Sequence, residues 1–173
     1  LGMYKEAIEA FKQTIMIGPD LPQAHTNLGF AYLNLYMYEE ALGAHKQAIR
    51  INPDDAVAHD NLGSVYSKSG MYKEAIEAHK NAIRIDPDVA NAHYNLGNAY
   101  RRSNMYKKAI ESYKQAIRID PDLPQAHYNL GVVYQKSNMY KKAMESYKQA
   151  IRINPDYAEA HSNLGNAYIE SGM

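Results

Sequence analysis

The sequence contains no cysteine and no tryptophan, and its two phenylalanines stand beside sixteen tyrosines. The lack of cysteine excludes disulfide bonds, thiolate zinc sites, thiol nucleophiles and iron–sulfur clusters. No apolar run approaches the roughly 18 residues of a membrane-spanning helix, and residues 1–8 show neither a charged leader region nor a cleavage signal. We therefore expect a soluble chain in a reducing compartment, the cytoplasm.

Neither sign of charge is in excess, because 19 Lys and Arg residues balance 19 Asp and Glu residues. A chain without net positive charge has no overall field to attract nucleic acid or anionic lipid, so we expect neither as a partner. Catalytic motifs are also missing, since the sequence has no G-x-S-x-G, no P-loop, no H-E-x-x-H and no Gly-rich phosphate loop. The sequence predicts a protein that is not an enzyme and needs no cofactor or metal.

One interval of 34 residues organises the whole chain. With 46% apolar and 22% charged residues, the chain has enough apolar side chains for a folded core, and its 173 residues suit one domain or one short array. The interval separates the members of four series, which are His25, His59, His93, His127 and His161; Pro19, Pro53, Pro87, Pro121 and Pro155; Gly29, Gly63, Gly97, Gly131 and Gly165; and Met3, Met37, Met71, Met105, Met139 and Met173. No insertion or deletion interrupts the register, so the chain is an internal repeat.

Each period has the pattern of two amphipathic helices. In residues 90–123 the first apolar stripe is Ala92, Leu96, Ala99 and Tyr100, and the second is Tyr106, Ala109, Ile110, Tyr113, Ala116 and Ile117. Between the stripes, Asn104 is expected to adopt the left-handed conformation that ends a helix, as are Gly70 and Asn138 in the neighbouring periods. The second helix is expected to stop before the Asp120-Pro121-Asp122 turn.

These residues resemble the tetratricopeptide repeat, a helix-turn-helix unit of 34 residues with the pattern L-G-x-x-Y, A-x-x-x-F/Y, A, P. In one period the pattern is filled by Leu96, Gly97, Tyr100, Ala109, Tyr113, Ala116 and Pro121. The resemblance implies an all-α fold, a right-handed α-solenoid of antiparallel helix pairs. It divides a single array, 1–173, into a C-terminal half-repeat at 1–21, full repeats at 22–55, 56–89, 90–123 and 124–157, and an N-terminal half-repeat at 158–173.

The sequence departs from the family pattern at three kinds of position. Histidine stands at the family's early tryptophan position throughout, His45 and His79 replace the second-helix aromatic residue, and Tyr36 stands where Gly or Asn usually ends the first helix. We expect the histidines to be structural, because equivalent residues one repeat apart are too distant to share a zinc ion. The pairs His25/His45 and His59/His79 are close enough in the pattern to approach each other, although no third ligand is evident.

Half-repeats at both ends predict faces without a partner. The expected helices at about 2–16 and 158–171 would each lack the other member of their pair. We expect Ile8, Phe11 and Ile15 at one end, and Leu164 and Tyr168 at the other, to face missing neighbours. This arrangement suggests head-to-tail self-association, in which the last helix of one copy pairs with the first helix of the next.

The resemblance implies that ligands are peptides held in a groove lined by the first helices. One position on that face is asparagine in every repeat: Asn27, Asn61, Asn95, Asn129 and Asn163. Because an amide both donates and accepts hydrogen bonds, such a row suits the backbone of an extended peptide. It is similar to the asparagine ladder in the superhelix of O-GlcNAc transferase. The alternative, that these amides bond within or between helices, stays open.

Variable positions beside the ladder would set specificity. Tyr94 and Tyr128 flank it, and Lys68, Arg101, Arg102 and Lys136 cluster near the ends of the middle first helices, which predicts a preference for acidic segments. Basic residues there also suit the helix macrodipole, so solvated helix ends are an equal alternative. Two other readings of the chain remain: the substrate-recognition arm of a larger enzyme, such as a glycosyltransferase, and a scaffold that assembles head to tail.

Overall fold

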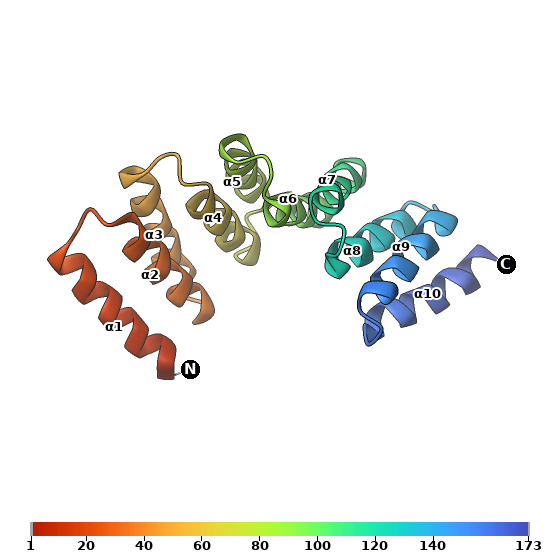
Figure 1. Ribbon diagram of the computed structural model, residues 1–173, viewed down its shortest axis with the longest axis horizontal. Helices are drawn as coiled ribbons and strands as arrows, with labels where there is room; N and C mark the ends of the chain where they lie inside the picture. The colour runs from red at the N-terminus through yellow and green to blue at the C-terminus, as the bar shows by residue number, and fades with distance from the viewer. Residues whose placement is uncertain (1, 173) are drawn as a thin grey trace. The chain divides into compact units, whose positions relative to one another are not determined.

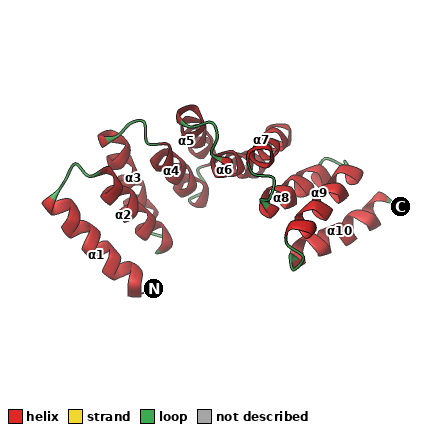
Figure 2. Cartoon of the chain, viewed as in Figure 1, coloured by secondary structure: helices red, strands yellow, loops and turns green. Residues whose placement is uncertain are grey.

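The computed structural model describes residues 2–172, and in this range every regular element is an α-helix (Figures 1 and 2). The helices are α1 (Gly2–Ile17), α2 (Pro22–Asn34), α3 (Tyr38–Ile51), α4 (Ala56–Lys68), α5 (Tyr72–Ile85), α6 (Ala90–Arg102), α7 (Tyr106–Ile119), α8 (Pro124–Lys136), α9 (Tyr140–Ile153) and α10 (Ala158–Ser171). The predicted all-α solenoid of helix pairs is confirmed. None of these helices combines the length and the hydropathy needed to cross a bilayer.

The chain forms two compact units, which we call unit 1 and unit 2. Unit 1 ends at Pro87 and contains α1 to α5, and unit 2 begins at Asp88 and contains α6 to α10. Within unit 1 the helix pairs α2/α3 and α4/α5 pack most closely, and within unit 2 the pairs are α6/α7 and α8/α9. Each pair is one predicted repeat, with a first helix of 13 residues and a second helix of 14.

A left-handed residue ends the first helix of each pair. Asn104, Asn138 and Gly70 have φ values of 57°, 58° and 83°, as the sequence predicts, and Tyr36 adopts the same conformation at 61°. The amide of the residue that follows then bonds back five residues, for example Met105 N–H to the carbonyl of Tyr100 at 2.9 Å. This bond pattern is that of a Schellman motif, which turns the chain directly into the second helix.

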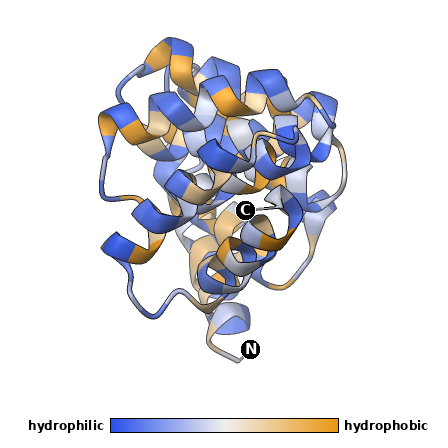
Figure 3. Ribbon diagram, turned by 90° about the vertical axis from the view of Figure 1, so that its right-hand side faces the viewer, coloured by the Kyte–Doolittle hydropathy of each residue, from blue (hydrophilic) through white to orange (hydrophobic). Residues whose placement is uncertain are grey.

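The core of each pair is built from small residues on the helix faces that meet. Along one helix, hydrophobic and hydrophilic segments alternate, as a helix with one apolar face requires (Figure 3). Ala92, Leu96, Ala99 and Tyr100 are all buried, so the predicted first stripe is confirmed. Alanine and glycine let the helices approach closely enough to bury the larger second-helix side chains between them.

Gly97 and Gly131 are the points of closest approach in unit 2. A Cβ atom at Gly97 would lie 2.6 Å from the ring of Tyr113, and one at Gly131 would lie 2.6 Å from the ring of Tyr147. In unit 1, Gly29 and Gly63 stand in the same relation to the imidazoles of His45 and His79. The glycine therefore creates the space that the second-helix ring fills.

The prediction for the N-terminal helix is wrong in part. Ile8 is buried against Leu28 and Ala31 of α2, and Phe11 and Ile15 pack on the same cluster. The face of α1 that stays exposed carries Met3, Met16 and Ile17 instead. The error arose because a second helix packs on the first helix of the following repeat as well as on its own. At the other end Leu164 is half-buried, whereas Tyr168 and Ile169 are 41% and 80% exposed.

Candidate interaction site on the first helices

The asparagines of unit 2 connect each first helix to the one before it. Asn129 on α8 is 8% exposed, and its Nδ2 donates to the hydroxyl of Tyr94 at 3.2 Å and to Oδ1 of Asn98 at 3.0 Å, both on α6. Asn163 on α10 repeats the first bond, since its Nδ2 donates to the hydroxyl of Tyr128 at 3.0 Å. The amide positions are therefore held by the tyrosine of the preceding repeat.

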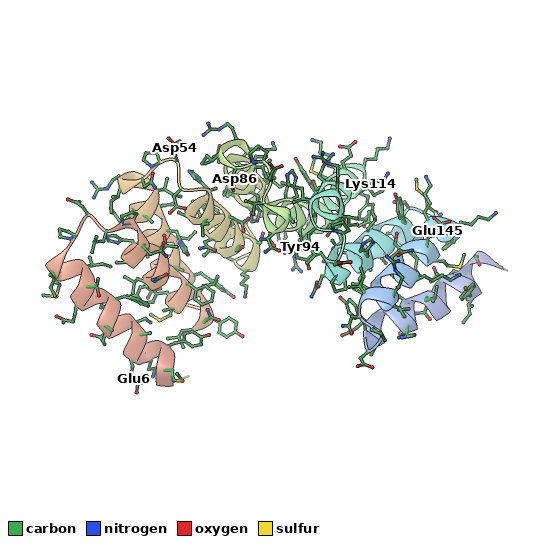
Figure 4. The ribbon with its side chains drawn as sticks, in the orientation of Figure 1. Glu6, Asp54, Asp86, Tyr94, Lys114 and Glu145 are labelled. Carbon is green, nitrogen blue, oxygen red and sulfur yellow. The ribbon has the colours of Figure 1, made fainter. Side chains whose placement is uncertain are left out.

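Tyr94 on α6 and the basic residue Lys114 on α7 are labelled below and above the α6/α7 pair in Figure 4. Tyr94 lies on the first-helix side, next to the ladder, and its ring also contacts that of Tyr113 with centroids 6.0 Å apart. Tyr128 has the matching contact with Tyr147 at 5.9 Å, and it packs on Tyr157 at 5.0 Å. The first-helix tyrosines are thus fixed by aromatic packing as well as by the asparagines.

The other members of the ladder are less uniformly placed. Asn27, Asn61 and Asn95 are half-buried. In α2, Oδ1 of Asn27 accepts a hydrogen bond from Nε2 of Gln23 at 2.9 Å, which is a bond within one helix. Unit 1 has Thr26 and Asp60 at the positions of Tyr94 and Tyr128, so it lacks the tyrosine hydroxyl that aligns the amide in unit 2.

Two buried tyrosine hydroxyls support the first-helix face of unit 2. Tyr113 and Tyr147 on the second helices are fully buried. The hydroxyl of Tyr113 donates to Oδ1 of Asn98, and that of Tyr147 donates to Oε1 of Gln135, each at 2.7 Å. No role was predicted for Asn98 and Gln135 from the sequence. Their signal is a polar residue on the first helix, one or two turns beyond the ladder position and opposite a second-helix tyrosine.

Burial determines the charge state of these hydroxyls. It raises the pKa of both Tyr113 and Tyr147 far above the usual value, and the positive charge of Arg101 only partly opposes the shift at Tyr113. Burial also raises the pKa of Tyr157 to about 12, with help from the neighbouring Tyr128 and Tyr94. All three stay protonated near neutral pH, so the hydroxyls of Tyr113 and Tyr147 remain hydrogen-bond donors to the amides.

The predicted basic residues lie near the ends of the first helices, and they differ in environment. Arg101 is half-buried beside Tyr113, whereas Lys68, Arg102 and Lys136 are exposed. Lys136 shares a pocket of about 360 Å³ with Asn163, lined also by Val132, Gln135, Asn138, Tyr140, Tyr147 and Glu170. Nε2 of Gln135 donates to Glu170 at 2.9 Å, which places a carboxylate in the same pocket as the lysine. Lys68 is in unit 1, at the end of α4.

The histidines have structural partners. Nε2 of His25, His59, His127 and His161 lies 2.9–3.0 Å from the carbonyl of the proline six residues earlier, and since a carbonyl only accepts, the ring donates. The proposed approach of His25 to His45 is therefore replaced by a bond to the chain before the helix. His45 and His79 lie inside unit 1. Among residues 2–172 no three histidine or carboxylate side chains group as a metal site would require.

The two buried histidines of unit 1 differ in their partners. Nδ1 of His79 is 2.7 Å from Oδ1 of Asp60 on the first helix of the same pair. Both ring nitrogens of His45 are buried without a hydrogen-bond partner among the described residues. Burial lowers the pKa of His45 to about 4, against a weaker opposing effect of Asp55. His45 is thus neutral in the folded chain at neutral pH.

Comparisons with known proteins agree with the repeat pattern. A family model described as TPR repeat matches residues 1–35, 37–70, 68–103, 97–138 and 136–172. Among solved structures, MamA is 26% identical with a TM-score of 0.82, covering 91% of this chain and 92% of that chain. YrrB is 23% identical with a TM-score of 0.78, over 94% and 84%. TTC0263 from Thermus thermophilus is 23% identical with a TM-score of 0.77, over 98% and 92%. No curated protein matches the sequence significantly.

Proposed function

Because the chain belongs to the tetratricopeptide repeat family, whose repeats are protein-interaction modules, we propose that it is a non-catalytic scaffold that binds an extended peptide along its first helices. The observation that carries this proposal is the matched placement of Asn129 and Asn163, each held by the tyrosine one repeat earlier. Among the structural neighbours, YrrB is a TPR protein with an unusual peptide-binding site. A repeated amide at a fixed interval suits the repeated backbone of a bound peptide.

The hydrogen bonds between helices do not use up the amides. An asparagine side chain offers two N–H donors and a carbonyl oxygen. In Asn129 both donors go to α6, and in Asn163 one donor goes to Tyr128, so in each amide the carbonyl oxygen is left for a peptide N–H. The bond to the tyrosine holds the amide in one orientation before the peptide arrives, and this reduces the conformational entropy lost on binding. We therefore propose that the tyrosines position the ladder and that the asparagines contact the peptide.

Basic residues near the ladder favour an acidic peptide. Arg101, Arg102 and Lys136 lie at the C-terminal ends of α6 and α8, so their charges adjoin the ladder of unit 2, and Lys68 has the same place on α4 of unit 1. We propose that they bind carboxylates that flank the bound segment. Such contacts are exposed, so the affinity should fall as the salt concentration rises.

A peptide-array screen followed by fluorescence anisotropy on the selected peptide tests the proposal. Asn129→Ala with Asn163→Ala removes two backbone contacts worth about 0.5–1.5 kcal/mol each, so binding should weaken by about fivefold or more. The matched control is Tyr94→Phe with Tyr128→Phe, which removes the hydrogen bonds from the asparagines to the tyrosines and keeps the amides. It should weaken binding by a smaller factor. Unchanged binding by the double asparagine variant, with an unchanged melting temperature, contradicts the ladder.

Gly165 supports a second candidate, head-to-tail association of two copies. No atom lies within 4 Å of a Cβ built at Gly165, whereas Gly97 and Gly131 are covered by tyrosine rings. Phe11 on α1 occupies the same position in the repeat as Tyr113 and Tyr147. We propose that α1 of another copy packs on α10 with Phe11 over Gly165. The two halves of the chain have opposite net charge, because residues 1–89 hold 8 basic and 12 acidic side chains and residues 90–173 hold 11 basic and 7 acidic side chains. This difference favours pairing of the C-terminal end of one copy with the N-terminal end of another.

Light scattering over a range of concentrations tests this second candidate. Gly165→Leu fills the open position and should abolish the concentration-dependent growth in mass. Gly43→Leu is the matched control, because its Cβ would also meet nothing within 4 Å but it lies on α3. A chain that stays monomeric at every concentration rules out the association.

A further inference from the structure

The turn between α8 and α9 carries Lys141 and Lys142, which the ladder does not use, beside Lys136, which the proposed peptide site on the first helices also uses. Lys136 is the last residue of α8, and Lys141 and Lys142 lie in the first turn of α9. All three are exposed. We call this surface, together with the turn residues Asn138, Met139 and Tyr140, the basic turn of unit 2. In unit 1 the places of the two α9 lysines are taken by Glu39 and Glu40 at the start of α3, and by Lys73 and Glu74 at the start of α5.

The lysines of the basic turn form no ion pair within the described chain, although Lys136 shares a pocket with Glu170. The first turn of α9 contains no acidic residue, although the positive end of the helix macrodipole favours one by about 0.3–1 kcal/mol. No carboxylate lies within 4 Å of Lys136 or Lys141 among the described residues. Lys142 lies 5.8 Å from the centre of the Tyr134 ring, which holds its ammonium group near the turn. The helix end and three lysines together make a concentrated positive site.

A pocket of about 420 Å³ opens at the same place. It is lined by Asn138, Met139, Tyr140, Lys141, Lys142 and Ser171. Met139 is 44% exposed, so a large apolar side chain faces solvent at its wall. The hydroxyl of Tyr140 donates to Oδ1 of Asn138 at 3.1 Å, and the left-handed backbone of Asn138 fixes the turn. The wall is therefore pre-formed, and a side chain entering it would not have to order the turn.

We propose that the basic turn of unit 2 binds an acidic protein segment that contains one large apolar residue. The apolar side chain enters the pocket beside Met139 and Tyr140, and carboxylates on either side of it pair with Lys136, Lys141 and Lys142. A peptide suits this geometry better than a lipid surface, because the pocket beside Met139 can take one apolar side chain and two of the lysines, Lys141 and Lys142, line it. Apart from Lys136, the site is built from the turn and the start of a second helix, so it does not depend on the asparagines of the ladder.

The test measures binding of a fluorescein-labelled synthetic peptide, with glutamates on both sides of a single leucine, to the full chain by anisotropy. Lys141→Gln with Lys142→Gln should weaken binding by about five- to tenfold, as expected for two partly exposed charge pairs. The matched control, Lys5→Gln with Lys114→Gln, removes the same charge from exposed positions elsewhere and should change binding by less than about twofold. The natural chain should bind a peptide with glutamine in place of glutamate at least as weakly as the double lysine variant binds the glutamate peptide.

Several outcomes would overturn the proposal. Equal losses in the two lysine variants would mean only general attraction between opposite charges, and equal binding of the glutamine peptide would mean that charge is irrelevant. A different class of partner would be shown if the peptide does not bind and if phosphatidylserine vesicles or polyuridylate bind in a way that depends on Lys141 and Lys142. The ladder variant, Asn129→Ala with Asn163→Ala, should bind this peptide normally. If it alone loses binding, the acidic peptide occupies the first-helix groove and the basic turn is not its site.

Discussion

Unit 1 and unit 2 place different rings at the same position of the repeat. Both bury a planar side chain of the second helix under a glycine of the first helix. In unit 1 the ring is an imidazole, His45 or His79, and in unit 2 it is a phenol, Tyr113 or Tyr147. The phenols reach further and donate their hydroxyls to Asn98 and Gln135, whereas His45 has no polar partner in the described chain.

The difference shows that, at this position of the repeat, the requirement for close packing is independent of the requirement for hydrogen bonding. Close packing requires a flat ring that fills the space beside the first-helix glycine, and both imidazole and phenol rings do so. The tyrosines of unit 2 also meet a hydrogen-bond requirement, because polar first-helix residues lie within their reach. Unit 2 therefore has the ordered side-chain network next to the ladder, while unit 1 has a buried group that is sensitive to protons.

The largest expected effect is the loss of stability of unit 1 in acid. The pKa of His45 is about 4 in the folded chain and about 6.5 when unfolded, so the unfolded chain takes up the proton first as the pH falls. The stabilisation is complete above pH 6.5 and disappears progressively toward pH 4, by up to about 3 kcal/mol. Hydrogen exchange of unit 1 amides at several pH values measures it.

The control for this acid effect is His45→Phe, which keeps a flat ring and removes the titrating group. The difference in exchange between neutral pH and pH near 4 should shrink by the share that His45 contributes. If the variant and the natural sequence show the same dependence on pH in unit 1, protonation of His45 is not the cause.

Next in size is the effect of a methyl group at the closest helix contacts. Gly97→Ala puts a Cβ 2.6 Å from the Tyr113 ring and should destabilise unit 2 by about 1–3 kcal/mol, and Gly29→Ala should do the same in unit 1 against His45. Urea denaturation measures both. Gly165→Ala is the matched control, since it meets nothing within 4 Å and should stabilise by up to about 1 kcal/mol through helix propensity. A stabilising Gly97→Ala would show that the ring yields to the extra atom.

A smaller effect should follow loss of one hydroxyl. Tyr113→Phe leaves Oδ1 of Asn98 without the donor that lies 2.7 Å away and should cost about 1 kcal/mol, and Tyr147→Phe should cost a similar amount at Gln135. Chemical denaturation gives the difference. Tyr4→Phe serves as control, because Tyr4 is exposed and its hydroxyl makes no hydrogen bond within the described chain. Equal values for Tyr4→Phe and Tyr113→Phe would contradict a role for the buried hydroxyls.

The smallest expected effect concerns charge at the start of the second helices. Glu39→Lys gives α3 the charge that α7 and α9 carry at Lys107 and Lys141, so it should destabilise unit 1 by about 0.5–1 kcal/mol at low salt. The effect should shrink at high salt because the charge is exposed. Glu39→Gln is the control and should cost about half as much. An effect that does not depend on salt would rule out an electrostatic origin.

The repeat itself determined how much of the fold could be predicted. A fixed interval repeated five times makes each helix visible in several copies, so the helix at 158–171 and the left-handed Asn104 follow from the pattern alone. The location of the ladder on the first helices follows in the same way. The prediction for α1 is wrong, because the sequence shows which residues are apolar and does not show on which neighbouring helix they pack.

The hydrogen-bond partners of the polar side chains could not be predicted from the sequence. The ladder amides were equally compatible with contacts inside the fold and with contacts to a peptide, because one helical face serves both. The bond from Asn129 to Tyr94 depends on the distance between α6 and α8, which the 34-residue interval alone does not specify. Asn98 was overlooked because the residue type at its position changes from one repeat to the next: Phe30, Ser64, Val132 and Asn166 stand there.

Four first-helix histidines donate to the carbonyl of the proline six residues earlier: His25, His59, His127 and His161. Each bond connects the loop between repeats to the helix that follows it. One residue inserted between the two would rotate the ring by about 100° around the helix and move it away from the carbonyl. Whole 34-residue repeats can therefore be added without disturbing this bond, whereas a change of length inside this six-residue segment would break it. The interval of 34 residues, which is constant along the chain, satisfies that geometric requirement in each repeat that makes the bond.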